Sequence, residues 1–137
     1  QRTFSIKAHV SNLGWQEPVY EGMTAGTTGR NLAIEALTIS KPDLGYSGNI
    51  EYRAHVQNIG WQKWVKNGKL AGTTGKSLSI EAVEIKLTGD LSKHYDVVYR
   101  AHVQGKCWLD WVKSGECAGT TGEALHMEAF EVKLVDK

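Results

Sequence analysis

Proline, cysteine and long apolar runs are scarce in this sequence. Its 137 residues include 2 Pro and 2 Cys. No apolar run approaches the roughly 20 residues of a membrane-spanning helix, so membrane insertion is not expected. The two cysteines, Cys107 and Cys117, say little about the compartment in which the chain works.

Charge of a single sign is also missing. The 16 Lys and Arg residues are interspersed with 15 Asp and Glu residues, and the formal net charge is +1. This leaves no broad basic surface for nucleic acid and no polybasic segment for an anionic membrane. No signal peptide is visible, because the chain opens with Gln-Arg-Thr-Phe and runs straight into strand-like sequence. A secreted protein trimmed to its mature domain has the same appearance.

Glycine, in contrast, is abundant at 15 residues, and 41% of the chain is hydrophobic. Many tight turns and few helix stops fit an all-β protein with short strands. The length suits a single domain, residues 1–137, with a real hydrophobic core.

Three internal repeats organise the chain, because several short strings recur at a spacing of 46 and then 47 residues. Ala-His-Val occurs at 8–10, 54–56 and 101–103. Ala-Gly-Thr-Thr-Gly occurs at 25–29, 71–75 and 118–122. A tryptophan follows each Ala-His-Val by five residues, at Trp15, Trp61 and Trp108. The repeats are placed at about 4–40, 50–87 and 97–134, named below copy one, copy two and copy three.

Each copy is expected to hold four strands. In copy two the first strand, 52–57, alternates apolar and polar residues, and the second runs over 61–66. Asn67-Gly68 is a strong hairpin signal before a third strand that ends in the Gly-Thr-Thr-Gly bend. In the fourth strand, 78–87, the apolar phase slips at Ala82-Val83, which indicates a β-bulge or a strand that bends around the core.

Twelve such strands should close around a pseudo-threefold axis, since one copy cannot bury its apolar face alone. The Gly hairpin within each copy favours a β-trefoil, with a β-prism as the alternative. An open solenoid of three units is the next alternative architecture.

Copy two resembles the repeat of a known family. The pattern at 52–87 is Tyr-Arg-Ala-His-Val-Gln-Asn-Ile-Gly-Trp-Gln-Lys-Trp-Val-Lys-Asn-Gly, then Ala-Gly-Thr-Thr-Gly, then Ile-Glu-Ala-Val-Glu-Ile-Lys-Leu. It resembles the clostridial hydrophobic repeat with a conserved tryptophan, the ChW repeat. The resemblance implies a secreted or cell-surface bacterial protein in which the repeats serve attachment to polysaccharide, cell wall or surface protein. Copy one departs from the pattern, with Pro18 in place of Trp64 and Trp111, and Ser11 in place of Gln57 and Gln104.

The five tryptophans are the first candidate ligand residues, because an indole face matches the apolar face of a sugar ring. Trp15, Trp61 and Trp108 occur in every copy, which favours a place in the core over a stacking platform. Trp64 and Trp111 lie three residues further on and should face the opposite side of the strand, outward, where they favour binding. Pro18 then predicts a poorer site in copy one.

His9, His55 and His102 are the second candidates, because they alternate with core residues and so point outward or into a groove. Each is either a hydrogen-bonding partner for a ligand hydroxyl or a cross-strand partner for Glu35, Glu81 or Glu128. A shared metal site on the axis is disfavoured, because Ala and Val occupy the axis-facing positions, and no cofactor is expected.

Cys107 and Cys117 lie on the paired strands of copy three. With a turn at Ser114-Gly115, Cys117 should pair opposite Val112 instead of Cys107, so a simple cross-strand disulfide is not predicted. A bridge through the bend before Trp108 stays open.

The favoured function is a non-catalytic, lectin-like module, secreted or at the cell surface, with up to three equivalent sites for glycan or cell-wall polysaccharide. The alternative is an adhesion module that binds a surface protein. An enzyme is not expected, because hydrolysis needs an asymmetric set of groups and the candidate acids are copies of one another. The predicted ligand residues are Trp64, Trp111, His9, His55, His102, Gln57, Gln104, Trp15, Trp61 and Trp108.

Overall fold

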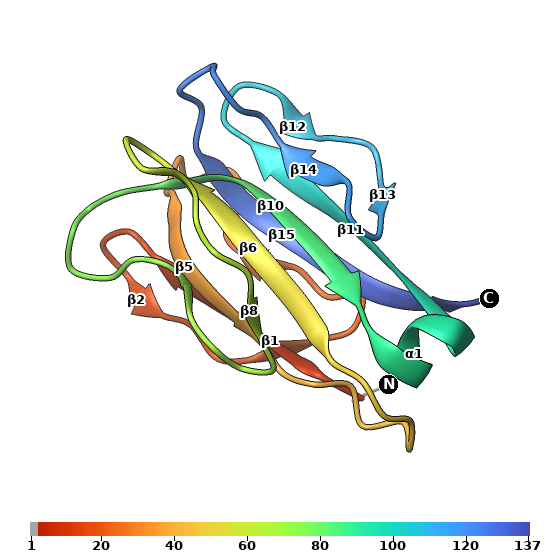
Figure 1. The fold of residues 1–137 in the computed structure, drawn as a ribbon. Helices are drawn as coiled ribbons and strands as arrows, with labels where there is room; N and C mark the ends of the chain where they lie inside the picture. The colour runs from red at the N-terminus through yellow and green to blue at the C-terminus, as the bar shows by residue number, and fades with distance from the viewer. Residues whose placement is uncertain (1–2) are drawn as a thin grey trace.

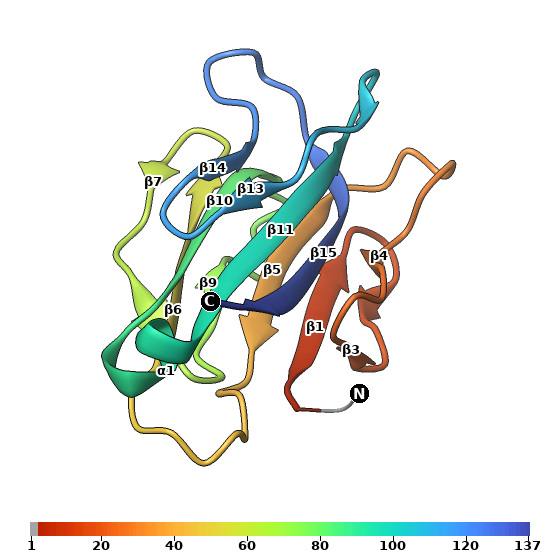
Figure 2. The same ribbon diagram turned by 90° about the vertical axis from the view of Figure 1, so that its right-hand side faces the viewer.

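Three antiparallel sheets of five strands each form the framework of the protein in a computed structural model that describes residues 3–137. Each sheet is built on the first and the last strand of one copy, which pair antiparallel although three short strands lie between them in the sequence (Figures 1 and 2). Each such pair is named here a long hairpin. These hairpins are β1 (Ser5–Val10) with β5 (Ile34–Ile39), β6 (Ile50–Val56) with β10 (Ile80–Leu87), and β11 (Tyr95–Val103) with β15 (Met127–Asp136).

Two short strands in each copy pair with its first long strand, where the sequence predicted one continuous strand. They are β2 (Gly14–Trp15) and β3 (Val19–Tyr20), β7 (Gly60–Trp61) and β8 (Val65–Lys66), and β12 (Cys107–Trp108) and β13 (Val112–Lys113). In copy two the interruption covers residues 62–64. The alternation of faces expected for 61–66 therefore does not carry through to Trp64.

The fifth strand of each sheet comes from a different copy. Strand β4 (Ala25–Gly26) of copy one joins the sheet of copy three, β9 (Ala71–Gly72) of copy two joins that of copy one, and β14 (Cys117–Gly119) of copy three joins that of copy two. The exchange is cyclic, so it ties the three copies into one ring. The turn predicted at Asn67-Gly68 is present, with φ of 47° and 84°. The strand that follows it leaves for the neighbouring sheet instead of completing a hairpin.

A β-bulge interrupts each long hairpin at the same place. The register shifts between Ile80 and Ala82 opposite β6, and likewise at the equivalent points of the other two hairpins. The extra residue is Glu35, Glu81 or Glu128. The bulge predicted from the phase slip in 78–87 is therefore confirmed.

The core lies between the three sheets and takes residues from all copies. The first long strands alternate strictly, so that Tyr52, Ala54 and Val56 are buried while Arg53 and His55 are not. This is the alternation that the sequence predicted. The other large, fully buried side chains include Phe130, Ile6, Ile34, Leu37, Ile85 and Met127.

The all-β class is confirmed, but the sheets do not close into a barrel. The β-trefoil is therefore not confirmed, and neither is the β-prism. The connection at 88–96 contains a short helix, α1 (Gly89–His94), that the sequence did not predict. It lies toward the same end of the long strands as the start of β1 and the end of β15 (Figure 1). Within residues 3–137, no helix has the length and apolar character needed to cross a bilayer.

Two buried tyrosines fasten neighbouring copies together. The Tyr52 hydroxyl accepts a hydrogen bond from the Ile39 N–H (3.0 Å) and donates one to the Lys69 carbonyl. The Tyr99 hydroxyl does the same with the Ile85 N–H (3.1 Å) and the Glu116 carbonyl. Burial raises the pKa of both phenols, which keeps them protonated as donors.

Replacing Tyr99 with Phe is expected to lower the free energy of unfolding by about 1–3 kcal/mol, because the buried Ile85 N–H loses its partner. Tyr46→Phe is the matched control. Its ring stacks on His94, and its hydroxyl makes no hydrogen bond within residues 3–137, so a change below about 0.5 kcal/mol is expected. Urea denaturation measures both. Equal decreases in the free energy of unfolding for the two variants would show that the Tyr99 hydroxyl does not stabilise the contact between copies.

Candidate functional site

A tryptophan, a histidine and a glutamate lie together on the outer face of each sheet. The Nδ1 atoms of His9, His55 and His102 lie 3.1, 3.0 and 3.0 Å from a carboxylate oxygen of Glu35, Glu81 and Glu128. The three imidazoles meet the rings of Trp15, Trp61 and Trp108 edge to face, with centroids 5.3, 5.2 and 5.2 Å apart. These groups are named the Trp–His–Glu clusters.

Backbone register explains why the three side chains meet. His55 is the cross-strand partner of Trp61, so both side chains lie on the same face of the sheet. The bulge adds Glu81 opposite this position and turns its carboxylate onto the same face. The cross-strand His–Glu contact considered from the sequence is therefore present in all three copies.

The expected core position of Trp15, Trp61 and Trp108 is wrong. Trp15 is 42% exposed, and Trp61 and Trp108 are half-buried. Their pairing with outward-facing histidines places them on the outside, because directly opposed residues share a face. Their retention in every copy thus does not reflect a buried role.

The expected separation of Trp64 and Trp111 onto the other face is also wrong. The Arg53 guanidinium lies 4.6 Å from the ring centroid of Trp61 and 5.0 Å from that of Trp64. Arg100 lies 4.4 and 4.8 Å from the rings of Trp108 and Trp111. Both tryptophans of a copy therefore contact the same arginine on one outer face, because the strand is interrupted between them.

Further charges extend these contacts in copies two and three. Arg53 binds Glu84 through Nε and Nη2 at 2.8 and 2.7 Å, and Arg100 binds Glu131 at 2.9 Å through both atoms. Lys86 and Lys133 lie 4.3 and 4.5 Å from the rings of Trp64 and Trp111. Cation–π contacts contribute about 0.5–2 kcal/mol each, so they hold both indoles in place. Trp111 still remains 37% exposed.

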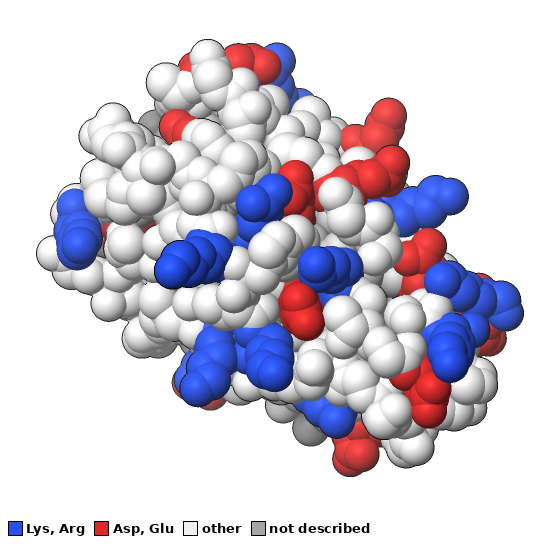
Figure 3. All heavy atoms as spheres, viewed as in Figure 1, with Lys and Arg blue, Asp and Glu red and all other residues white. Residues whose placement is uncertain are grey.

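Copy one lacks this arrangement. It has Lys7, Thr38 and Pro18 where copy two has Arg53, Glu84 and Trp64. Lys7 lies 5.7 Å from the ring of Trp15, which leaves Trp15 the most exposed of the five tryptophans. The face of the molecule in Figure 3 carries basic side chains scattered among acidic and uncharged ones, in keeping with the net charge of +1.

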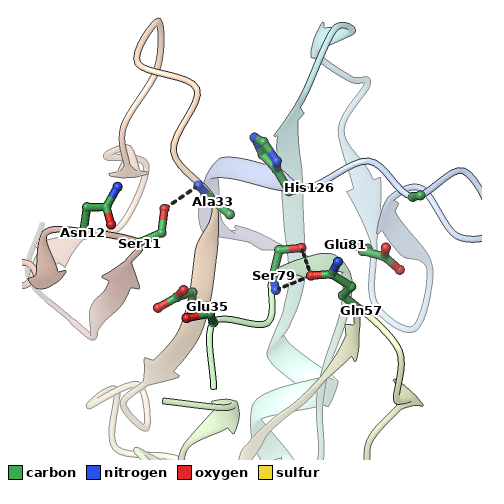
Figure 4. Close-up of a pocket in the computed structure, with 10 residues that line it drawn as sticks. Ser11, Asn12, Ala33, Glu35, Gln57, Ser79, Glu81 and His126 are labelled. Atoms are coloured by element: carbon green, nitrogen blue, oxygen red, sulfur yellow. Dashed lines mark hydrogen bonds between the residues drawn. The ribbon is translucent and has the colours of Figure 1, made fainter. Parts of the chain in front are cut away.

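The predicted glutamines lie at the ends of the long strands. Gln57 lines a cavity of about 350 Å³ that receives residues from all three copies, among them the cluster residues Glu35 and Glu81 together with His126 (Figure 4). The Gln57 Oε1 accepts hydrogen bonds from the Ser79 N–H and hydroxyl, both at 3.2 Å. Gln104 accepts one from the His126 N–H at 3.3 Å. Gln57 therefore holds a strand end beside this cavity and is not brought to Trp64.

Cys107 and Cys117 are both exposed free thiols. The predicted pairing of Cys117 with Val112 is wrong, because Cys117 lies on β14 and pairs with Glu84 of copy two. Within residues 3–137, no three His, Cys, Asp or Glu side chains are grouped so as to hold a metal ion.

Comparison with models of protein families shows to which family the three copies belong. The model named Clostridial hydrophobic W, or ChW, matches the chain three times, at residues 9–40, 55–89 and 102–136. The chain belongs to this family. ChW repeats occur in clostridial surface proteins. No curated protein and no solved structure gave a significant match.

The ChW repeats contain site residues that sequence reasoning missed. Arg53 and Arg100, with their partners Glu84 and Glu131, were not among the predicted residues. Their signal was present, because the Arg, the Glu and the second Trp occur together in copies two and three and are all absent from copy one. Joint presence and absence across repeats is the mark of side chains that contact one another.

Proposed function

We propose that this ChW protein is a non-catalytic attachment module that binds glycan at the three Trp–His–Glu clusters. The observation that carries the proposal is the same arrangement on all three sheets. Each places a partly exposed indole beside a histidine that a glutamate orients. Sequence features that differ among the copies, such as Pro18, leave this arrangement intact.

The chemistry of each cluster suits a sugar. An exposed indole offers an apolar face to the C–H groups of a pyranose ring. In each cluster a glutamate oxygen lies 3.0–3.1 Å from the histidine Nδ1, so Nε2 is the ring nitrogen left to meet a ligand hydroxyl. A stacking group beside a polar ring nitrogen is typical of a shallow site for hydroxylated ligands.

Repetition suits a polysaccharide surface. Shallow sites bind weakly one at a time, but linked sites that engage a repetitive surface together gain ~10²–10⁴ in affinity. A small soluble substrate offers no such gain. The proposed setting is therefore secreted or cell-surface, with the protein attached to polysaccharide or cell wall.

A second candidate function is adhesion to a surface protein. Leu13 and Ile59, at equivalent turns of copies one and two, are 40% and 50% exposed. Exposed aliphatic residues near a partly exposed Trp and an Arg also describe a protein-binding hot spot. Free sugars should inhibit attachment in the first case and leave it unchanged in the second.

Intrinsic tryptophan fluorescence tests the proposal, because all five tryptophans lie at or beside the clusters. Purified cell walls and soluble polysaccharides are titrated into the wild type, the triple variant Trp15→Ala, Trp61→Ala, Trp108→Ala, and the double variant Trp64→Ala, Trp111→Ala. A glycan should shift the wild-type emission, the triple variant should not bind in pull-down, and the double variant should bind several-fold more weakly.

The matched control is Met23→Ala with Leu70→Ala, since these residues are 50% and 43% exposed and lie outside the clusters. It should bind like the wild type. Thermal melting checks that every variant is folded. Undiminished binding by the folded triple variant would overturn the proposed sites.

A further inference from the structure

Copy one contains a cavity at a place where copy two holds a side chain of its own. Its volume is about 200 Å³, and its lining is apolar at Ile6, Ala8, Val19 and Ala25. Gln16, Glu17, Thr24 and Gly26 complete the lining. The cavity lies away from the outward positions of the Trp–His–Glu clusters, because Ile6 and Ala8 are core-facing residues of β1.

The equivalent place in copy two is occupied by a carboxamide. Gln62 accepts a hydrogen bond from the Gly72 N–H through Oε1 at 2.7 Å and donates one from Nε2 to the Gly72 carbonyl at 3.3 Å. In copy three this position is Leu109. In copy one the residue is again glutamine, but Gln16 Nε2 donates to the Gly14 carbonyl at 3.5 Å instead.

Gly26 presents the same pair of backbone groups as Gly72. Strand β4 is an edge strand, and Gly26 is paired with Ala129 while the next residue, Thr27, donates its N–H to Glu128. In an antiparallel ladder, alternate residues point their N–H and carbonyl away from the partner strand. The Gly26 groups thus point away from β15, and within residues 3–137 no side chain bonds them.

We propose that this cavity binds a primary carboxamide, the side chain of a Gln or Asn residue in a peptide partner. The carboxamide would repeat what Gln62 does in copy two, accepting from the Gly26 N–H and donating to the Gly26 carbonyl. The methylene groups beside it pack against Ile6, Ala8 and Val19. A carboxylate is disfavoured there, because it lacks the donor and lies near Glu17 and the Gly26 carbonyl.

This site is independent of the proposed glycan sites, so the two proposals can fail separately. The test is an NMR titration of ¹⁵N-labelled protein with capped glutamine (N-acetyl-glutamine methylamide) and with the equally capped glutamate. Capped glutamine should shift the Gly26 amide signal, and capped glutamate should bind at least about 10-fold more weakly. No shift at Gly26, or equal affinity for both probes, overturns the proposal.

Three substitutions sharpen the result. Gln16→Leu introduces the residue that copy three has and should abolish the response at Gly26, whereas Gln62→Leu should leave it unchanged. Gln62→Ala should open the same cavity in copy two and add a response at Gly72. If folded Gln62→Ala shows none, the equivalence on which the proposal rests is wrong.

Discussion

Loss of the clustered tryptophan from two of the three copies is expected to weaken binding to an immobilised polysaccharide by about 100-fold or more. Trp61→Ala with Trp108→Ala leaves the Trp–His–Glu cluster of copy one alone. A single site no longer benefits from linkage, which contributes ~10²–10⁴ when several sites engage one surface. The same double variant should bind a short soluble oligosaccharide only several-fold more weakly, because such a ligand reaches one cluster at a time and the remaining copy one lacks the second tryptophan.

Surface plasmon resonance on immobilised polysaccharide measures the first quantity, and calorimetry with the oligosaccharide measures the second. The stoichiometry should fall from three ligands per chain to one. The control pair Met23→Ala and Leu70→Ala should change neither quantity. A loss on the surface no greater than the loss for the oligosaccharide, apart from the threefold fall from three sites to one, would show that the clusters act independently.

Much of this arrangement follows from local sequence. Alternation in 52–57 decides which side chains are buried, and the structure buries Tyr52, Ala54 and Val56 as predicted. The phase slip at Ala82-Val83 predicted the bulge, because a strand with one extra residue exchanges its faces. The contact between His55 and Glu81 then follows, since the bulge brings the acid to the outer face.

The positions of the tryptophans did not follow, because the parity argument assumed an unbroken strand. Residues 62–64 leave the strand geometry, so three steps along the chain no longer mean opposite faces. Arg53, placed between the two rings, supplies the contact that brings both to one side. Such a contact depends on side chains from two segments, and strand periodicity carries no information about it.

The exchange of strands between copies could not be predicted from the sequence either. The Asn67-Gly68 turn forms as predicted, yet Ala71 and Gly72 pair with Leu37 and Ala36 of copy one. A strand of two residues has almost no intrinsic preference for one neighbouring strand over another, so tertiary packing decides which strand it pairs with. A turn signal therefore predicts the reversal of the chain and leaves the pairing open.

The exchanged strand makes Gly72 the position where a single added carbon should do most damage. Its φ is +92°, and a Cβ would lie 2.3 Å from the Glu35 carbonyl oxygen and 2.8 Å from the Ala36 Cα. Both are backbone atoms of β5, so they cannot move aside without displacing that strand. Gly72→Ala is therefore expected to lower the free energy of unfolding by more than about 4 kcal/mol, beyond the range of most point substitutions.

Gly75→Ala is the matched control, because its φ is +75° and no heavy atom lies within 4 Å of the added Cβ. Backbone strain alone should lower the free energy of unfolding of Gly75→Ala by roughly 1–3 kcal/mol. Guanidinium denaturation of both variants separates strain from steric clash. Equal losses would mean that β9 shifts freely against β5, in which case the ring of exchanged strands is not what holds the copies together. A much greater loss for Gly72→Ala would show that β9 must lie close against β5 for copies one and two to stay together.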